Sequence, residues 1–384
     1  MKFRRHLSWL IAVVVAGSIL SAQAASKHKV TPAGTNSAAA PKKAKAGSST
    51  RSTPFILTDQ EPVSQRAPGD FAIAVLPDTQ MYTAARNHGK PEMLDAQVEW
   101  ILANRASRNI VYVTTEGDIS NDGNKHLVQW LRATNALFRL EDRVRTGLPE
   151  GLPWSAVVGN HDTHSGGTDL FNAFLGTNHF VGRSYYGGHY GTNNDSHYDL
   201  FSASGHDFIV VALTMSAGKD PSLMRWANDV LRAHPNREAI VVSHSLLEPG
   251  AWPHPAAWTK DGEKIFPALT NNPNLFLMLC VHRHGEGRRH EVLGNGQSVH
   301  VVLSDYQSYT NGGNGFMRIM EFSPRNKTIV VKTFSPWTRQ WTTNTDGYFT
   351  LAWTGRNGAP AQRIADERKE KKRNPASGPS GGGQ

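Results

Sequence analysis

The chain has 384 residues, a formal net charge of +9 and a single cysteine, Cys280. One cysteine excludes an internal disulfide. The charge is uneven, because residues 1–69 and 356–384 together carry 17 of the 41 basic side chains but 5 of the 32 acidic ones. The part between them is slightly acidic, which argues against a nucleic-acid-binding protein, since such a protein carries its basic patch on the folded domain.

The first 24 residues have the pattern of a secretory signal peptide. A basic start (Lys2, Arg4 and Arg5) precedes an apolar run over 7–20, and Ala22-Gln23-Ala24 has the small residues of a cleavage site. The apolar run is shorter than the roughly 20 residues that span a bilayer. Arg4-Arg5 leaves twin-arginine export open beside ordinary secretion. Either route predicts an exported protein, periplasmic or secreted.

Two further segments lack the composition of a packed core. Residues 25–69 are rich in Ala, Ser, Thr, Pro and Lys and are predicted to form a flexible linker. Residues 356–384 are charged and then glycine-rich, which predicts a disordered basic tail. These basic segments either contact an anionic envelope surface weakly or only solubilise the protein. The folded domain is therefore expected over 70–355.

Strand-like and helical patterns alternate along this domain. The first half reads as strand 71–76, helix 91–106, strand 110–115, helix 124–142 and strand 154–158. The second half reads as a strand-rich stretch 198–213, helix 221–233, strand 239–243, helix 262–269, strand 275–280 and short strands over 287–352. This order predicts one large α/β domain with two β-sheets packed face to face and helices outside.

Five short segments place Asp, Asn, Gln or His where an apolar run stops. They are Asp78-Thr79-Gln80, Gly117-Asp118-Ile119-Ser120-Asn121, Gly159-Asn160-His161-Asp162, His244, and His282-Arg283-His284. Carboxylate, amide and imidazole groups at successive strand ends are the ligands of a mixed oxygen and nitrogen metal site. Such a site activates water and binds an anionic substrate.

In their order and spacing these segments resemble the calcineurin-like metallophosphoesterase superfamily. Its pattern is D-x-H, G-D-x-x-[DN], G-N-H-[DE], a lone His after a strand, and G-H-x-H. The chain departs from it twice, with Gln80 in place of His and Val281 in place of Gly. The resemblance covers about residues 70–355. It implies a four-layer α/β/β/α sandwich of two mixed β-sheets flanked by helices.

The resemblance also implies two divalent metal ions that share Asp118 as a bridge. Carried over by position, the first ion takes Asp78, Gln80, Asp118 and His284, and the second takes Asp118, Asn160, His244 and His282. Oxygen and imidazole ligands suit Mn²⁺, Fe or Zn²⁺ and do not suit Cu(I). Two hypotheses stay open for Gln80: it is a weak amide ligand, or it hydrogen-bonds a metal-bound water.

By the same resemblance, His161 faces the leaving-group oxygen as general acid or charge stabiliser, and Asp162 orients it. Asn121 stands where purple acid phosphatases have a metal-binding Tyr. Asp122 stands where protein Ser/Thr phosphatases have a phosphate-binding Arg. Both subfamilies are therefore disfavoured.

The sequence predicts an exported metal-dependent phosphoesterase. It would hydrolyse small phosphate mono- or diesters with metal-activated hydroxide at a dinuclear centre. The alternative is a non-catalytic binding module on the same fold with a degraded metal site, favoured by Gln80 and Val281; the presence of His161 favours the enzyme. Aromatic residues in 180–197 and 249–258 either grip a base, sugar or lipid, or pack against one another.

Overall fold

The computed structural model describes residues 55–353 and residue 355. The predicted signal peptide (1–24), the predicted linker up to residue 54 and the predicted tail (356–384) lie outside the described residues. In the described part of the chain, no helix has the length and apolar character needed to cross a membrane.

One mixed sheet holds eight strands. In spatial order they are β1 (Leu57–Thr58), β14 (Gln340–Thr342), β13 (Thr328–Ser335), β12 (Met317–Ser323), β2 (Phe71–Leu76), β3 (Ile110–Thr115) and β4 (Trp154–Ser155), while β15 (Tyr348–Ala352) pairs with β13 outside this path. Strands β2, β3 and β4 are parallel, and β12 is antiparallel to β2.

The second mixed sheet holds seven strands. In spatial order they are β10 (Gly285–Val292), β11 (Ser298–Asp305), β9 (Leu275–Cys280), β8 (Glu238–Ser243), β7 (His206–Leu213), β6 (His197–Ala203) and β5 (Tyr186–His189). Strands β11, β9, β8 and β7 are parallel.

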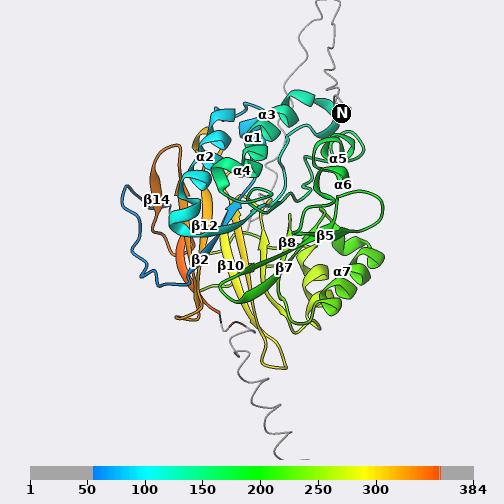
Figure 1. The fold of residues 1–384 in the computed structure, drawn as a ribbon, viewed down its shortest axis with the longest axis vertical. Helices are drawn as coiled ribbons and strands as arrows, with labels where there is room; N and C mark the ends of the chain where they lie inside the picture. Colours follow the sequence, from blue (N-terminus) through cyan, green and yellow to red (C-terminus); the bar gives the residue numbers. More distant parts are fainter. Residues whose placement is uncertain (1–54, 354, 356–384) are drawn as a thin grey trace, which may run out of the picture. The chain divides into compact units, whose positions relative to one another are not determined.

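Helices cover the outer faces of both sheets (Figure 1). The longer ones are α2 (Pro91–Arg108), α3 (Leu127–Leu137), α5 (Asp169–Leu175), α7 (Pro221–Ala233) and α8 (Gly262–Leu269). The short ones are α1 (Gln80–Thr83), α4 (Arg143–Thr146), α6 (Thr177–Phe180) and α9 (Thr310–Gly313).

Side-chain alternation along β2 shows how the layers form. Ala72, Ala74 and Leu76 pack against α2 and α3, whereas Phe71, Ile73 and Val75 pack against the second sheet. Because successive side chains of a strand point to opposite faces, a strand buried on both sides is apolar throughout. A third apolar layer lies between the second sheet and helices α7 and α8. The predicted four-layer α/β/β/α sandwich of two mixed sheets is thus confirmed.

The helix boundaries follow local sequence signals. Helix α2 starts with Pro91 at its first turn and ends at Asn109, which has the left-handed conformation (φ 49°). Helix α7 begins after Asp220, whose carboxylate accepts hydrogen bonds from the backbone N–H groups of Ser222 and Leu223. The predicted helix 124–142 is broken before α3, because His126 adopts φ −129° and ψ 87°, outside the helical region.

Residues 55–69, which the sequence assigned to the linker, pack on the first sheet. The ring of Phe55 lies 4.9 Å from that of Phe316, and Leu57 pairs with Thr342 in the β1–β14 ladder. The carboxylate of Glu61 forms ion pairs with Arg108 (2.6 Å) and with the buried ammonium of Lys332 (2.8 Å). The predicted boundary at residue 70 is therefore wrong, and the folded unit includes residue 55.

We expect a chain that begins at residue 70 to be less stable than one that begins at residue 55. Deleting 55–69 removes Glu61 from Lys332, whose side chain is only 2 % exposed and keeps Glu321 as its ion-pair partner. Losing one partner of a largely buried charge costs roughly 2–3 kcal/mol. The melting temperature should fall by roughly 3–5 °C. Thermal unfolding of the two truncated chains measures the difference, and equal melting temperatures would contradict the packing described above.

Candidate metal centre

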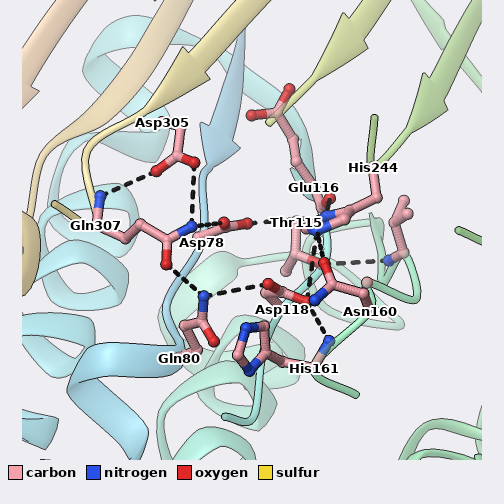
Figure 2. Close-up of polar contacts among 12 residues, drawn as sticks. Asp78, Gln80, Thr115, Glu116, Asp118, Asn160, His161, His244, Asp305 and Gln307 are labelled. Carbon is pink, nitrogen blue, oxygen red and sulfur yellow. Dashed lines mark hydrogen bonds and ion pairs between the residues drawn. The ribbon is translucent and has the colours of Figure 1, made fainter. Parts of the chain in front are cut away.

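The polar segments meet at the carboxyl ends of parallel strands, and strands from both sheets contribute (Figure 2). Asp78 follows β2, Asp118 follows β3 and Asn160 follows β4 in the first sheet, while His244 follows β8 and His282 follows β9 in the second. Carboxyl ends of parallel strands are the usual place for a ligand site in an open α/β sheet.

Two glycines of the motifs let these strand ends approach closely. A Cβ on Gly117 would lie 2.5 Å from Nδ1 of His244, and a Cβ on Gly159 would lie 2.1 Å from Oδ1 of Asp118. Asp118 (φ 49°) and His282 (φ 75°) also have positive φ, which non-glycine residues rarely adopt outside functional or turn positions. The glycines and the positive φ angles thus allow the backbone to bring the candidate ligands close together.

Asp118, His244 and His282 form a group whose ligand atoms all lie within 4.8 Å of one another. Nε2 of His244 lies 3.4 Å from Oδ1 of Asp118 and 3.1 Å from Oδ1 of Asn160. Nδ1 of His244 lies 2.9 Å from the carbonyl oxygen of Glu116, so Nδ1 must be the protonated nitrogen. In the neutral imidazole, Nε2 then carries the free lone pair and lies close to both of these oxygens. This is the complete set predicted for the second metal ion.

The electrostatics of this group suit a cation. Burial, together with the nearby His244, lowers the pKa of His282 to about 4, so its imidazole is neutral and able to bind metal. Burial alone would lower the pKa of His244, but the Asp118 carboxylate raises it above its usual value. The group therefore attracts either a proton or a metal ion.

The residues predicted for the first metal ion are arranged differently. Gln80 is fully buried, and its Nε2 donates to Oδ2 of Asp118 (3.1 Å) and to Oε1 of Gln307 (2.5 Å). Nε2 of Gln307 donates to Oδ2 of Asp78 (2.5 Å) and to Oδ2 of Asp305 (3.0 Å). His284 is exposed and is not part of the metal-ligand group. Figure 2 shows this chain of amides and carboxylates beside Asp118.

The centre holds more buried acceptors than donors. Among the described residues, Oδ1 of Asp78, Oε1 of Gln80 and Oε1 of Glu116 are buried without a hydrogen-bond partner. Burial, and then the carboxylates of Asp305 and Asp118, raise the pKa of Asp78 well above its usual value. A divalent cation would relieve this excess of negative charge. The residues present therefore fit a metal ion.

His161 lies at the rim, next to the ligand Asn160. Its backbone N–H donates to Oδ1 of Asp118 (2.8 Å), and its ring Nδ1 lies 2.8 Å from the carbonyl oxygen of Asn121. Asp162 accepts hydrogen bonds from the backbone N–H groups of Gly159 (2.9 Å) and Ser120 (2.8 Å). The prediction that Asp162 orients His161 is thus wrong. The Asn121 carbonyl orients the ring, and Asp162 ties the two metal-site loops together.

Sequence reasoning missed three buried polar residues of the site: Glu116, Asp305 and Gln307. A usable signal was present, because the apolar run Val301–Leu303 is followed by Ser304-Asp305-Tyr306-Gln307. This is the same pattern of an apolar run that stops at a carboxylate or amide.

A cavity of about 700 Å³ adjoins the centre and shares His282 with it. Its lining holds four exposed cations and three acidic side chains: Lys219, Lys260, Lys264, Arg283, Glu248, Asp261 and Glu263. Trp258 also lines it, but its ring stacks on Phe266 (4.6 Å between centroids) and faces the Arg289 guanidinium (4.8 Å).

The aromatic residues of 180–197 also pack on one another. The ring of Tyr186 stacks on those of Phe180 and His197. For these rings the structure favours the packing hypothesis over the substrate-gripping one.

No family model matches the chain. It is 34 % identical over 278 residues to the uncharacterized protein YvnB of Bacillus subtilis (strain 168), and the match covers 70 % of this chain and 20 % of YvnB. The chain thus spans about a fifth of the length of that relative.

Similar solved structures include a dimetal phosphatase from Danio rerio, at 13 % identity and TM-score 0.47, covering 74 % of this chain and 99 % of that one. GAP50, the anchor in the inner membrane complex of Plasmodium, matches at 12 % identity and TM-score 0.45, covering 77 % and 94 %.

The two mixed sheets with flanking helices, and the motif segments gathered at one edge of them, are features of this chain itself. They confirm the predicted fold class, an α/β sandwich of two mixed β-sheets with flanking helices.

Proposed function

We propose that the chain is a metal-dependent phosphoester hydrolase. The observation that carries the proposal is the convergence of Asp118, Asn160, His244 and His282 on one point, with His161 beside it. A divalent ion held there lowers the pKa of a bound water and offsets the negative charge of a phosphate ester. Mn²⁺, Fe or Zn²⁺ suits these ligands.

The residues around the ion position have separable tasks. Asp118 is fixed by two donors, the backbone N–H of His161 and Nε2 of Gln80. Since Nδ1 of His161 faces the Asn121 carbonyl, its Nε2 is the nitrogen left for the substrate. In the imidazolium form Nε2 can donate a proton to the departing oxygen, which is general acid catalysis.

The neighbouring cavity supports an anionic substrate. None of Lys219, Lys260 and Lys264 has an acidic side chain within ion-pair distance among the described residues, whereas Arg283 lies 3.2 Å from Glu248. The lining thus has one more cation than carboxylate, and a local excess of positive charge beside a metal centre concentrates anionic substrates. A small phosphoester is therefore the proposed substrate class.

Replacing Lys260 and Lys264 together by Gln should raise KM for a phosphoester by roughly 3–30-fold, because each exposed charge contributes about 0.3–1 kcal/mol to attraction of an anion. The turnover number should change little, since neither lysine belongs to the ligand group. The difference in KM between the variant and the wild type should shrink as salt is added. Steady-state kinetics at two ionic strengths measure it, with Arg325→Gln on the turn between β12 and β13 as the control. An unchanged KM would remove the cavity from the substrate path.

The second candidate is a non-catalytic binding module, favoured by the amide chain at the first metal position. One experiment separates the two. Apo-protein is reconstituted with Mn²⁺, Zn²⁺ or Fe²⁺ and assayed with chromogenic phosphate mono- and diesters, followed by a panel of natural phosphoesters. Turnover that a chelator abolishes supports the hydrolase. Metal binding with no turnover on any ester would favour the binding module.

Export, the absence of a specific nucleic-acid site and a weak contact of the basic segments with an anionic envelope surface stay predictions. Export and the envelope contact depend largely on residues outside the described part of the chain.

A further inference from the structure

We propose that Gln80, Gln307 and Asp305 replace one of the two metal ions with a hydrogen-bonded chain, so that the centre holds one tightly bound ion. The remaining ion would lie at Asp118, Asn160, His244 and His282, a position that rests on the proposed function. Nothing in the sequence motifs assigns Asp305 or Gln307 to the site.

The orientation of the Gln307 amide is determined by its neighbours. Both hydrogens of its Nε2 are used, one by Oδ2 of Asp78 (2.5 Å) and one by Oδ2 of Asp305 (3.0 Å). Turning the amide over would place its oxygen against two carboxylates. Asp305 also holds the backbone of this residue, because Oδ1 of Asp305 accepts from the Gln307 N–H (3.0 Å).

The orientation of the Gln80 amide follows from that of Gln307. Oε1 of Gln307 is an acceptor, so the group that faces it must be Nε2 of Gln80 (2.5 Å). The other hydrogen of this Nε2 points to Oδ2 of Asp118 (3.1 Å). Two amides thus direct four N–H bonds, three of them at carboxylate oxygens.

These N–H groups are directed at carboxylate oxygens that an ion at the first position would need as ligands. Oδ2 of Asp78 and Oδ2 of Asp118 each already accept an amide hydrogen. A cation there would face the positive ends of two N–H dipoles. Asp78, Gln80, Asp118 and Gln307 are at most 6 % exposed. Bulk water would therefore not replace the hydrogen bonds that a cation at the first position would break.

His284, the fourth ligand predicted for the first ion, does not make up for the carboxylate oxygens that already accept hydrogen bonds. His284 is exposed, whereas the Asp118–His244–His282 group is buried or half-buried. The hydrogen-bonded chain therefore offsets part of the negative charge of Asp78, Asp118 and Asp305 with N–H dipoles, although Oδ1 of Asp78 keeps no hydrogen-bond partner among the described residues. We expect the second ion to bind at least about 10²-fold more weakly than the first, which corresponds to losing two charge-assisted hydrogen bonds.

Metal stoichiometry tests this proposal without an activity assay. The full chain, made metal-free, is titrated with Mn²⁺, and the metal that survives gel filtration is counted by elemental analysis. The wild type should retain about one equivalent, with the electron paramagnetic resonance signal of an isolated Mn²⁺. Gln80→His combined with Gln307→Leu removes the donors and adds an imidazole, and should retain a second, magnetically coupled ion.

Controls locate the retained ion. Gln60→His makes the same Gln-to-His substitution at an exposed position, and this variant should retain one equivalent of Mn²⁺. His244→Ala should lose the single ion, while Gln80→Ala should keep it. Two equivalents of similar affinity in the wild type, or loss of the single ion in Gln80→Ala alone, would overturn the amide-chain proposal. A wild type that retains no metal would instead refute the proposed function. Because the wild-type count decides by itself, the test stands even if the double variant fails to fold.

Discussion

Asp118→Asn is expected to lower turnover by at least about 10³-fold and to deplete the bound metal. Asp118 is the one carboxylate of the ligand group, so the substitution removes its only negative charge. The substitution would also bring two hydrogen-bond donors face to face. The two oxygens of Asp118 accept from the His161 N–H and from Nε2 of Gln80, and one of these donors would face the new NH₂ group. The turnover number and the metal content per chain measure the effect.

The matched control is Asp122→Asn, four residues further along the same loop. Its carboxylate pairs with Arg86 (3.2 Å) and accepts from Gln129 outside the ligand group. This variant should keep its metal and most of its activity. Full metal content and near-normal turnover in Asp118→Asn would exclude Asp118 as a ligand.

His161→Gln is expected to keep its metal and lose about 10²–10⁴ in turnover on esters with poor leaving groups. The backbone N–H that supports Asp118 remains, so the ligand group should be intact. The loss should be much smaller with a nitrophenyl ester, because nitrophenolate departs without needing a proton. A plot of turnover against the pKa of the leaving group should therefore be steeper for the variant.

His164→Gln is the control for this prediction. The ring of His164 lies 4.4 Å from that of His161, and its Nδ1 lies 3.0 Å from the same Asn121 carbonyl. It has no contact with Asp118 among the described interactions. If His161→Gln instead lost its metal, or lost the same factor on every leaving group, the proton-donor role would be refuted.

Much of the fold was predictable because its central strands are buried on both faces. Strands β2, β3 and β9 have the predicted limits, since a doubly buried strand is a continuous apolar run ended by polar residues. Residues 55–69 were assigned wrongly for the opposite reason. Their apolar start (55–57) is only three residues long, and the rest is held by Glu61 and Ser64 through partners more than 40 positions away, which no local pattern reveals.

The ligand group was predictable from strand ends, whereas the side-chain directions were not. Asp162 follows His161 in the sequence, yet its carboxylate faces Gly159 and Ser120. Gln80 and Gln307 are 227 positions apart, and their contact depends on how the second sheet, which holds β11, packs against the first, which holds β2. The motif pattern located Gln80 but carried no information about its partner.

The candidate ligands come from both sheets, which determines when the proposed ion would bind during folding. Asp118 and Asn160 follow strands of the first sheet, and His244 and His282 follow strands of the second. Neither half of the ligand set can bind an ion well by itself, so tight uptake must wait until the two sheets have docked. A bound ion then cross-links the layers and favours the folded state by mass action. Binding of the proposed ion would therefore be the last step of folding.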